Sequence, residues 1–334
     1  MAFRDVLGHE KEIGQLQRAI LLNRVVHSYL FWGNEGVGRK KVALEFAKTL
    51  NCLGGGPTPI EACDQCVSCR KIDRQLHPDV LLIEPDNQTI RKDQILQMQQ
   101  ELVYRPSEGR RRVCIVSAAD RMAPHMANVL LKTLEEPPLH TVIILLAPHP
   151  RRLLPTIRSR CQPIRFASLP LEVVSKWLVD HEGLEPGEAR LLASFSEGSP
   201  GRALELRDKV ARIPREEFLK EWVGAKGFSF ETIERWVESL PTQREEVLLL
   251  LEVAKTLLRD LVVSKLCRDP SKLFHRDLAE KLEALASSWT LSALMKRLDA
   301  LQRTIVAISP IRGNANPALA VEAMMLSWDM KSSG

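Results

Sequence analysis

The chain has 334 residues, of which 45% are hydrophobic and 27% are charged, the composition of a soluble globular protein. Its length exceeds what one ordinary core supports, so we expect two or three domains. No apolar run reaches the roughly 20 residues that cross a bilayer, and the first residues are not a secretory signal. These features exclude an integral membrane protein and indicate a cytoplasmic location. The net charge of +5 permits contact with nucleic acid but does not require it.

Residues 29–50 have the order strand, tight turn and helix that is typical of a phosphate-binding loop. Four apolar residues lead directly into Gly33, Gly36 and Gly38, and apolar residues then recur at helical spacing. Glycines let the backbone turn so that successive N–H groups, together with the positive end of the following helix, face an anion. We therefore expect a P-loop scaffold here.

The loop departs from the pattern G-x-x-x-x-G-K-[ST] that serves a magnesium nucleotide. Arg39 stands in the place of the lysine, and Lys40 stands in the place of the hydroxyl residue. The planar Arg39 fork is not interchangeable with an ammonium. Lys40 removes a Mg²⁺ ligand and adds a charge that repels the ion, by a few kcal/mol at about 4 Å. We expect a degenerate P-loop without phosphoryl transfer, and the sequence leaves open whether ATP or ADP occupies it.

Four of the seven cysteines are clustered after this helix. Cys52, Cys63, Cys66 and Cys69 follow the spacing C-x10-C-x2-C-x2-C. In a cytosolic chain such spacing indicates metal ligands before disulfides. Four thiolates can bind a tetrahedral Zn²⁺ and leave no open position for water. We therefore expect a structural Zn²⁺ site in a loop at 52–69; the alternatives are chance clustering and a substitute ligand, His77.

The remainder of the first half alternates apolar strands with helices. Strands are expected at 80–83, 113–116, 142–146 and 163–166, helices at 90–104 and 126–134, and an entry segment followed by a helix at 3–22. Such alternation is typical of a parallel α/β sheet.

The third strand of a P-loop ATPase ends in acidic residues that hold Mg²⁺ and activate water. In this chain Ser117 and Ala118 stand there, and Asp120 follows, where we expect it to cap the next segment. Two separate departures, in the loop and at this strand, agree. We therefore expect that the isolated chain is not an ATPase.

Strand signals stop after residue 169. Short helices are expected at 171–180, 189–195 and 202–209, and the rest of the chain is expected to be helical, with long helices at 247–266 and 294–308. Asn316 and Pro317 form a good cap and first position for a last helix. The fold class is thus α/β followed by all-α.

Several stretches are more specific than these patterns. They are V-L-G-H at 6–9, H-S-Y-L-F at 27–31, the four-cysteine spacing, N-V-L-L-K-T-L-E-E-P-P at 128–138, S-R-C at 159–161 and I-R-G-N-A-N-P at 311–317. In them the chain resembles the delta-prime subunits of bacterial DNA polymerase III clamp loaders, which belong to the AAA+ family. The resemblance covers nearly the whole length. It implies a RecA-like domain with the zinc module at 1–168, a three-helix lid at 169–209 and an oligomerising helical collar at 210–334.

The resemblance also implies a function in DNA replication, as part of a DNA-directed DNA polymerase (nucleotidyltransferase) holoenzyme. Such a subunit is a non-hydrolysing stator, one fixed end of a ring that loads the sliding clamp. Its partners would be ATPase subunits, a clamp-opening delta subunit and, through the complex, the clamp and primer-template DNA. Arg160 would be an arginine finger that acts in trans in a neighbour's ATP site, where a guanidinium stabilises phosphoryl charge. The alternative is that Arg160 only pairs with an acid.

Other functions stay open. The first is an ATP-hydrolysing motor subunit of the gamma/tau kind, in which Arg39 or Lys40 replaces the usual lysine. The second is a DNA-binding module formed by the cysteine loop, although residues 54–69 carry few basic side chains. A departure in the lid argues against the motor, because relatives that use ATP have a phosphate-sensing arginine in Gly-Ser-x-Arg. Here Arg202 falls one position late after Gly198 and Ser199.

Overall fold

A computed structural model describes residues 2–54, 59–86, 89–225, 227–267, 269–309 and 313–329 of the chain. The chain forms two compact units, one made of Met1–Trp177 and Ser196–Arg202 and the other of Leu178–Phe195 and Ala203–Gly334. The predicted division into three domains at 168 and 209 stays a prediction. Parts of two predicted features, the glycine run at 55–57 and the motif residues 311–312, lie outside the described residues.

The first unit contains a five-stranded parallel sheet. Its strands, in spatial order, are β2 (Val80–Ile83), β3 (Arg112–Val116), β4 (Thr141–Ala147), β1 (Ser28–Gly33) and β5 (Gln162–Phe166). The central strands β3 and β4 are buried along their whole length, as continuous apolar runs in a parallel sheet covered on both faces should be. The predicted parallel α/β sheet is confirmed, and each predicted strand is present.

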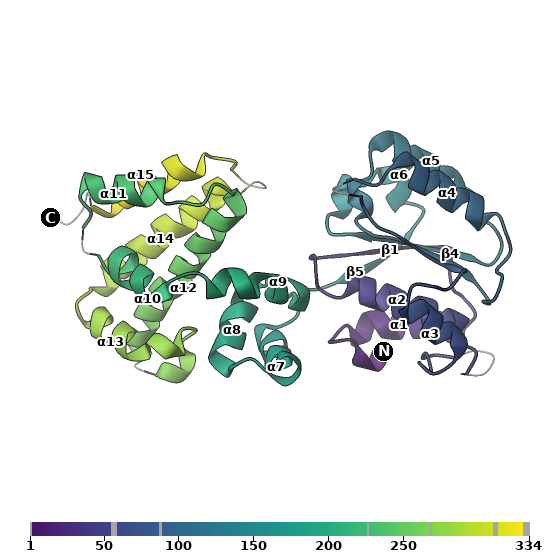
Figure 1. The fold of residues 1–334 in the computed structure, drawn as a ribbon, viewed down its shortest axis with the longest axis horizontal. Coiled ribbons are helices and arrows are strands. Elements are labelled where there is room, and N and C mark those ends of the chain that lie inside the picture. Colours follow the sequence, from purple (N-terminus) through teal and green to yellow (C-terminus); the bar gives the residue numbers. More distant parts are fainter. Residues whose placement is uncertain are drawn as a thin grey trace. The chain divides into compact units, whose positions relative to one another are not determined.

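Helices cover both faces of this sheet (Figure 1). On one face lie α1 (Glu10–Leu21), α2 (Arg39–Asn51) and α3 (Val67–Asp73), and on the other α4 (Lys92–Leu102), α5 (Pro124–Glu135) and α6 (Pro155–Arg158). Because side chains alternate along a strand, Phe31 packs with Phe46 of α2, whereas the preceding Leu30 belongs to the core that contains Leu130 of α5.

Short elements complete the first unit: η1 (Phe3–Asp5), η2 (Ala119–Arg121) and η3 (Pro150–Arg152). The entry segment and helix expected at 3–22 are present as η1 and α1, separated at His9, which has a left-handed φ of 64° just before α1. The cysteine loop predicted at 52–69 leads into α3, a helix that the sequence analysis did not predict. That helix is capped by a sulfur, since Cys66 Sγ accepts a hydrogen bond from the backbone N of Cys69.

The order of the strands places the glycine loop. β1 lies between β4 and β5, where the order of connections reverses, and the loop follows its carboxyl end. Ligands of open α/β sheets bind outside the carboxyl ends of the strands at such a switch point. The amino ends of β1 and β5 lie at the other end of the strands, away from the glycine loop.

The predicted change from α/β to all-α is confirmed. After α7 (Leu171–Glu182), the elements are α8 (Pro186–Phe195), α9 (Pro200–Ala211), α10 (Arg215–Phe218), η4 (Leu219–Val223), α11 (Phe230–Glu238), α12 (Arg244–Cys267), η5 (Pro270–Lys272), η6 (Arg276–Leu278), α13 (Ala279–Ser287), α14 (Leu291–Ile308) and α15 (Pro317–Asp329). α12 packs against both α13 and α14. Asn316 caps α15, as predicted, because its Oδ1 accepts from the N of Ala318 at 2.9 Å. Among the described residues, none of the helices combines the length and apolar character that a bilayer crossing requires.

Candidate functional site

The glycine loop has the backbone of an anion-binding turn. Gly33, Gly36 and Gly38 have φ values of 150°, 72° and 116°, a region that side chains disfavour. A Cβ at Gly33 would also lie 2.1 Å from the carbonyl oxygen of Phe166 in β5. Gly38 directly precedes the first turn of α2, so the positive end of that helix faces the loop. The predicted scaffold is therefore present.

Arg39, in the place of the P-loop lysine, is buried. Its residue is 7% exposed, and its Nη1 has no hydrogen-bond partner among the described residues. Burial lowers the pKa of the guanidinium, and the charges of Asp120 and Glu35 oppose that shift. Asp120 was expected to cap the following segment, but this prediction is wrong: the cap positions of η2 and α5 are Ala118 and Ala123. Asp120 is instead an electrostatic neighbour of Arg39.

Lys40 stands where a magnesium-binding hydroxyl would be, and its ammonium is already paired. Nζ lies 2.8 Å from Oε1 of Glu84, the residue that follows β2. Past the end of β3, Ser117 and Ala118 offer no carboxylate, and Ser117 N donates to Ile83 O. The site residues Arg39 and Lys40 thus lie at the glycine loop without a hydroxyl ligand beside them.

The chain itself contacts the loop from two sides. Ser199 Oγ donates to the carbonyl oxygen of Glu35 at 2.7 Å, and the N of Gly201 donates to that of Gly36 at 3.1 Å. On the other side, Nε2 of the buried His9 lies 2.9 Å from the carbonyl oxygen of Val37. These contacts hold the loop in a closed form through its own backbone.

Arg202, the arginine displaced from the phosphate-sensing position, pairs with Glu197 at 3.3 Å. Both side chains are about half exposed, so the pair is worth about 1 kcal/mol or less. The backbone N of Arg202 donates to Ser199 Oγ, which ties the start of α9 to the segment that touches the loop.

Arg160 lies near the amino ends of the strands, whereas the glycine loop lies at their carboxyl ends. Its carbonyl oxygen accepts a 2.7 Å hydrogen bond from Ser28 Oγ, and Ser28 is the first residue of β1. The glycine loop follows the other end of the same six-residue strand. At about 3.3 Å per residue, the two sites are roughly 17 Å apart. The structure therefore does not bring Arg160 together with the loop of its own chain.

The Arg160 guanidinium is held at the surface by two acceptors. Nη2 pairs with Oε1 of Glu135, the last residue of α5, at 2.6 Å, and Nη1 donates to the carbonyl oxygen of Thr156 at 2.9 Å. The two charged side chains are 36% and 49% exposed. A pair this exposed contributes about 1 kcal/mol or less, so another anion can compete for the guanidinium. Glu135 is a site neighbour that the sequence analysis did not identify.

The four clustered cysteines converge as predicted. Their sulfur atoms all lie within 4.8 Å of one another, and each is a free thiol. Cys52 ends α2, Cys66 caps α3 and Cys69 lies within α3. A tetrahedral Zn²⁺ with Zn–S bonds of about 2.3 Å separates its sulfurs by about 3.8 Å, so the observed cluster fits a metal ion of this kind.

Hydrogen bonds within the cluster favour the thiolate of Cys66. Burial raises the pKa of Cys66, but the backbone N–H groups of Cys69 and Leu53 donate to its sulfur and bring the pKa down to about 6. Burial also raises the pKa of Cys69 above its ordinary value. Cys63 N donates to the Cys52 sulfur, and Cys66 N to the Cys63 sulfur, both at 3.4 Å.

His77, the substitute ligand considered above, is engaged elsewhere. Its Nδ1 accepts from the backbone N of Asp79 at 3.1 Å, and its Nε2 lies 3.1 Å from Ser68 Oγ. Burial lowers the pKa of this imidazole. The candidate metal centre therefore consists of the four cysteines.

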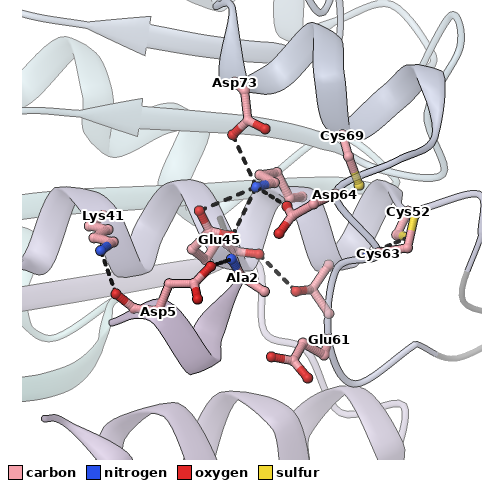
Figure 2. Close-up of polar contacts among 12 residues, drawn as sticks. Ala2, Asp5, Lys41, Glu45, Cys52, Glu61, Cys63, Asp64, Cys69 and Asp73 are labelled. Atoms are coloured by element: carbon pink, nitrogen blue, oxygen red, sulfur yellow. Dashed lines mark hydrogen bonds and ion pairs between the residues drawn. The ribbon is translucent and has the colours of Figure 1, made fainter. Parts of the chain in front are cut away.

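The sequence analysis missed an ion cluster beside these cysteines, centred on the buried Lys48 of α2. Its ammonium contacts carboxylates of Glu45, Asp64 and Asp73. Figure 2 shows Asp64 and Asp73 on the side of α2 where Cys52, Cys63 and Cys69 lie. The available signal was the pair Glu45 and Lys48, which interrupts the apolar pattern of α2 shortly before Cys52.

Comparison with known proteins gives consistent matches. A family model described as "DNA polymerase III, delta subunit" matches residues 8–170. The chain is 31% identical over 329 residues to DNA polymerase III subunit delta' of Bacillus subtilis, which covers 95% of this chain and 97% of that protein. It is also 31% identical over 315 residues to DNA polymerase III subunit tau of Escherichia coli, covering 91% of this chain and 48% of tau.

A solved structure is also similar to this chain. It is a DNA polymerase III gamma subunit-related protein from Thermotoga maritima, with 18% identity, a TM-score of 0.44 and coverage of 95% of this chain and 98% of that one. Among these matches, the similarity to the Bacillus delta' subunit extends over nearly both full chains at 31% identity. The chain therefore belongs to the delta' family of DNA polymerase III clamp-loader subunits.

Proposed function

We propose that this subunit does not hydrolyse ATP and instead acts as a stator that lends Arg160, in trans, to the ATP site of a neighbouring subunit. Its partners are then clamp-loader ATPase subunits and a clamp-opening delta subunit, and the complex loads the sliding clamp onto primer-template DNA in the cytoplasm. Contacts with DNA phosphates in such a complex weaken as salt rises and are largely independent of sequence.

The position of Arg160 carries this proposal. The Arg160 backbone is hydrogen-bonded to the first residue of β1 and its guanidinium pairs with Glu135 at the end of α5, whereas the glycine loop follows the carboxyl end of β1. Because the length of β1 separates Arg160 from the glycine loop of its own chain, Arg160 cannot stabilise phosphoryl charge on a nucleotide bound at that loop. A nucleotide that Arg160 contacts would therefore be bound by another subunit, and hydrolysis would depend on assembly.

The glycine loop supports the non-hydrolysing part of the proposal. Mg²⁺-dependent transfer needs a hydroxyl ligand and a carboxylate on the neighbouring strand. At the position of the hydroxyl ligand, Lys40 supplies an ammonium that is paired with Glu84. At the position of the carboxylate, the chain has Ser117 and Ala118. An unhydrolysed nucleotide without metal is compatible with this loop.

The stator role is supported by the closed form of the loop. Ser199 and Gly201 donate to the carbonyls of Glu35 and Gly36, so residues of the same chain contact the loop directly. A subunit whose own segment holds the loop needs no nucleotide to fix that contact. We infer that its conformation changes little through the ATP cycle of its partners.

We also propose that Cys52, Cys63, Cys66 and Cys69 hold a structural Zn²⁺. The ion would cross-link the end of α2 to α3, and four thiolates leave no position at which it could activate water. The nearby loop carries few basic residues, so this module is proposed to stabilise the fold and not to bind DNA.

The decisive experiment reconstitutes the complex with Arg160→Ala and measures its clamp- and DNA-stimulated ATPase. Arginine fingers accelerate hydrolysis about 10³-fold or more in well-studied cases. We expect turnover at the adjacent site to be lost while gel filtration shows an intact complex. Arg158→Ala, two residues earlier, is the matched control and should leave the rate unchanged. Normal ATPase activity with Arg160→Ala would refute the finger.

A second candidate, an ATP-hydrolysing motor, is favoured by the 31% identity with a tau subunit over 315 residues. Single-turnover hydrolysis by the purified chain with Mg²⁺ and ATP separates the two functions. We expect no turnover. Turnover that Lys40→Ala abolishes would replace the stator with the motor.

A further inference from the structure

One buried ammonium lies beside the cysteine cluster. Lys48 is in the last turns of α2 and is fully buried. Its Nζ lies 3.1 Å from Glu45 Oε2 and 3.0 Å from Asp73 Oδ1, and it also pairs with Asp64 Oδ1. In Figure 2 the carboxylates of these three residues point toward one another from α2, the cysteine loop and α3.

Two of these carboxylates belong to the two halves of the cysteine cluster. Asp64 lies in the turn between Cys63 and Cys66 with a left-handed φ of 57°, and its backbone N–H donates to the Cys69 sulfur. Asp73 is the last residue of α3, the helix that contains Cys69. The Lys48 ammonium thus contacts carboxylates of both segments that bring ligands to the metal position.

Charge alone does not explain why a cation is placed here. Four thiolates around a Zn²⁺ would leave a net charge of about −2, and the C-terminal end of α2, which Cys52 caps, adds partial negative charge. Lys48 is the basic residue in the last turn of that helix, but its ammonium is already paired with the carboxylates of Glu45, Asp64 and Asp73. Lys48 therefore acts on the cluster through these carboxylates.

Two hydrogen bonds that join the cysteine loop to the first residues and to α1 are exposed. Arg4 N donates to Glu61 Oε1 at 3.1 Å, and Gln17 Nε2 donates to the carbonyl oxygen of Ile60 at 3.2 Å. Water can replace such bonds at little cost. Loss of one partner of a buried pair is far more costly, because it leaves an uncompensated charge.

We propose that Lys48 is the positioning residue of the cysteine site, acting through Asp64 and Asp73 to hold the two halves of the cluster in tetrahedral geometry. This inference rests on the proposed metal site. Groups outside the ligand set that orient metal ligands typically contribute 10- to 100-fold to metal affinity. Removal of the Lys48 contacts should therefore weaken metal binding by about that factor.

The test uses Asp64→Asn and Lys48→Met in the full chain. Asparagine keeps the shape of Asp64 and tolerates its left-handed backbone, so Asp64→Asn should fold even where Lys48→Met does not. Zn²⁺ affinity is measured by competition with a chromophoric chelator, and Co²⁺ absorption reports the coordination geometry. Thermal unfolding with and without EDTA gives the stabilisation that the metal supplies. Lys71→Met is the matched control, because Lys71 of α3 pairs with Glu108, which is not part of the Lys48 ion cluster.

We expect Asp64→Asn to weaken Zn²⁺ binding about tenfold or more and to reduce the difference in Tm between the metal-bound and metal-free protein, with a distorted Co²⁺ spectrum. Lys71→Met should match the wild type. If Asp64→Asn binds Zn²⁺ with unchanged affinity and lowers the Tm of the metal-bound and metal-free protein equally, the role is purely structural and the inference is overturned. A wild-type chain that binds no Zn²⁺ would instead refute the metal site itself.

Discussion

The two ends of α2 differ in what they retain. At its N-terminal end the glycine loop keeps the backbone of a nucleotide site, but the two side chains that would complete the chemistry are Arg39 and Lys40. At its C-terminal end four thiols converge with every ligand of a metal site present. One end is a scaffold without its reactive groups, and the other is a complete donor set.

The difference shows that backbone geometry and side-chain chemistry are separable. The loop is held by glycine conformations and by contacts from His9, Ser199 and Gly201, none of which needs a nucleotide. The cysteine cluster has no such independence, because four clustered thiols, two of them buried, gain little from one another without an ion. We therefore expect substitutions at the cysteine end to have larger effects than substitutions at the glycine end.

The largest expected effect comes from Cys69→Ser. Cys69 is a fully buried member of the cluster, and its loss leaves three thiolates and an open position. Structural Zn²⁺ sites bind with apparent free energies of about 10 kcal/mol or more, so the variant should lose its metal and much of the associated stability. Elemental analysis and thermal unfolding measure both.

Cys267→Ser provides the control, because Cys267 is an exposed thiol at the end of α12. It should retain one metal ion per chain and an unchanged Tm. Retention of a full equivalent of metal by Cys69→Ser would break the comparison, since the cluster would not then depend on its complete set of ligands.

A smaller effect concerns the pH dependence of the buried carboxylates beside the cluster. Burial raises the pKa of Glu45 from its ordinary 4.5 to about 7, although Lys48 opposes the rise. The folded state thus holds a proton that the unfolded chain releases at lower pH. This contribution to stability is complete below pH 4.5 and is lost as the pH rises through about 7.

Glu45→Gln should remove this pH dependence. Between pH 5 and pH 8 the variant should gain stability relative to the wild type, by about 1.4 kcal/mol per pH unit at most and about 3 kcal/mol in total. Hydrogen exchange of the α2 amides, measured with a chelator present so that metal release does not contribute, reports the local free energy of unfolding. Parallel pH profiles for the two proteins would show that Glu45 is not the titrating group.

Much of the fold could be predicted because its signals are local. The apolar runs of β3 and β4 and the glycines after β1 mark strands and a turn without knowledge of any partner. The helix α3 was missed because its cap is the sulfur of Cys66 and not an ordinary capping residue.

The ligands of the candidate site could be predicted, but their neighbours could not. Cysteine spacing and glycine spacing lie within one stretch of sequence. The pairs of Lys40 with Glu84 and Arg160 with Glu135 join segments that meet only in the folded sheet. The separation of Arg160 from its own loop follows from the pairing of β5 with β1, which alternation of strands and helices does not specify.

The smallest expected effect tests the glycine end of α2. Arg39→Lys combined with Lys40→Thr restores the pattern G-x-x-x-x-G-K-T. Lys40 is 42% exposed, so removal of its charge should improve Mg²⁺-dependent nucleotide binding by only about 1–2 kcal/mol, roughly tenfold. Calorimetric titration of ADP with Mg²⁺ and with EDTA measures the difference. Hydrolysis of ATP should stay absent, because Ser117 and Ala118 still supply no carboxylate.

Lys41→Thr is the matched control for the loop variant, since Lys41 donates to the carbonyl oxygen of Asp5 and lies one position beyond the P-loop pattern. It should leave nucleotide binding unchanged. An equal gain with EDTA would mean that the restored lysine acts on phosphate alone and that Mg²⁺ still finds no site. Turnover by the loop variant would show that the two side chains alone silenced this subunit, and the glycine end would then be as complete as the cysteine end.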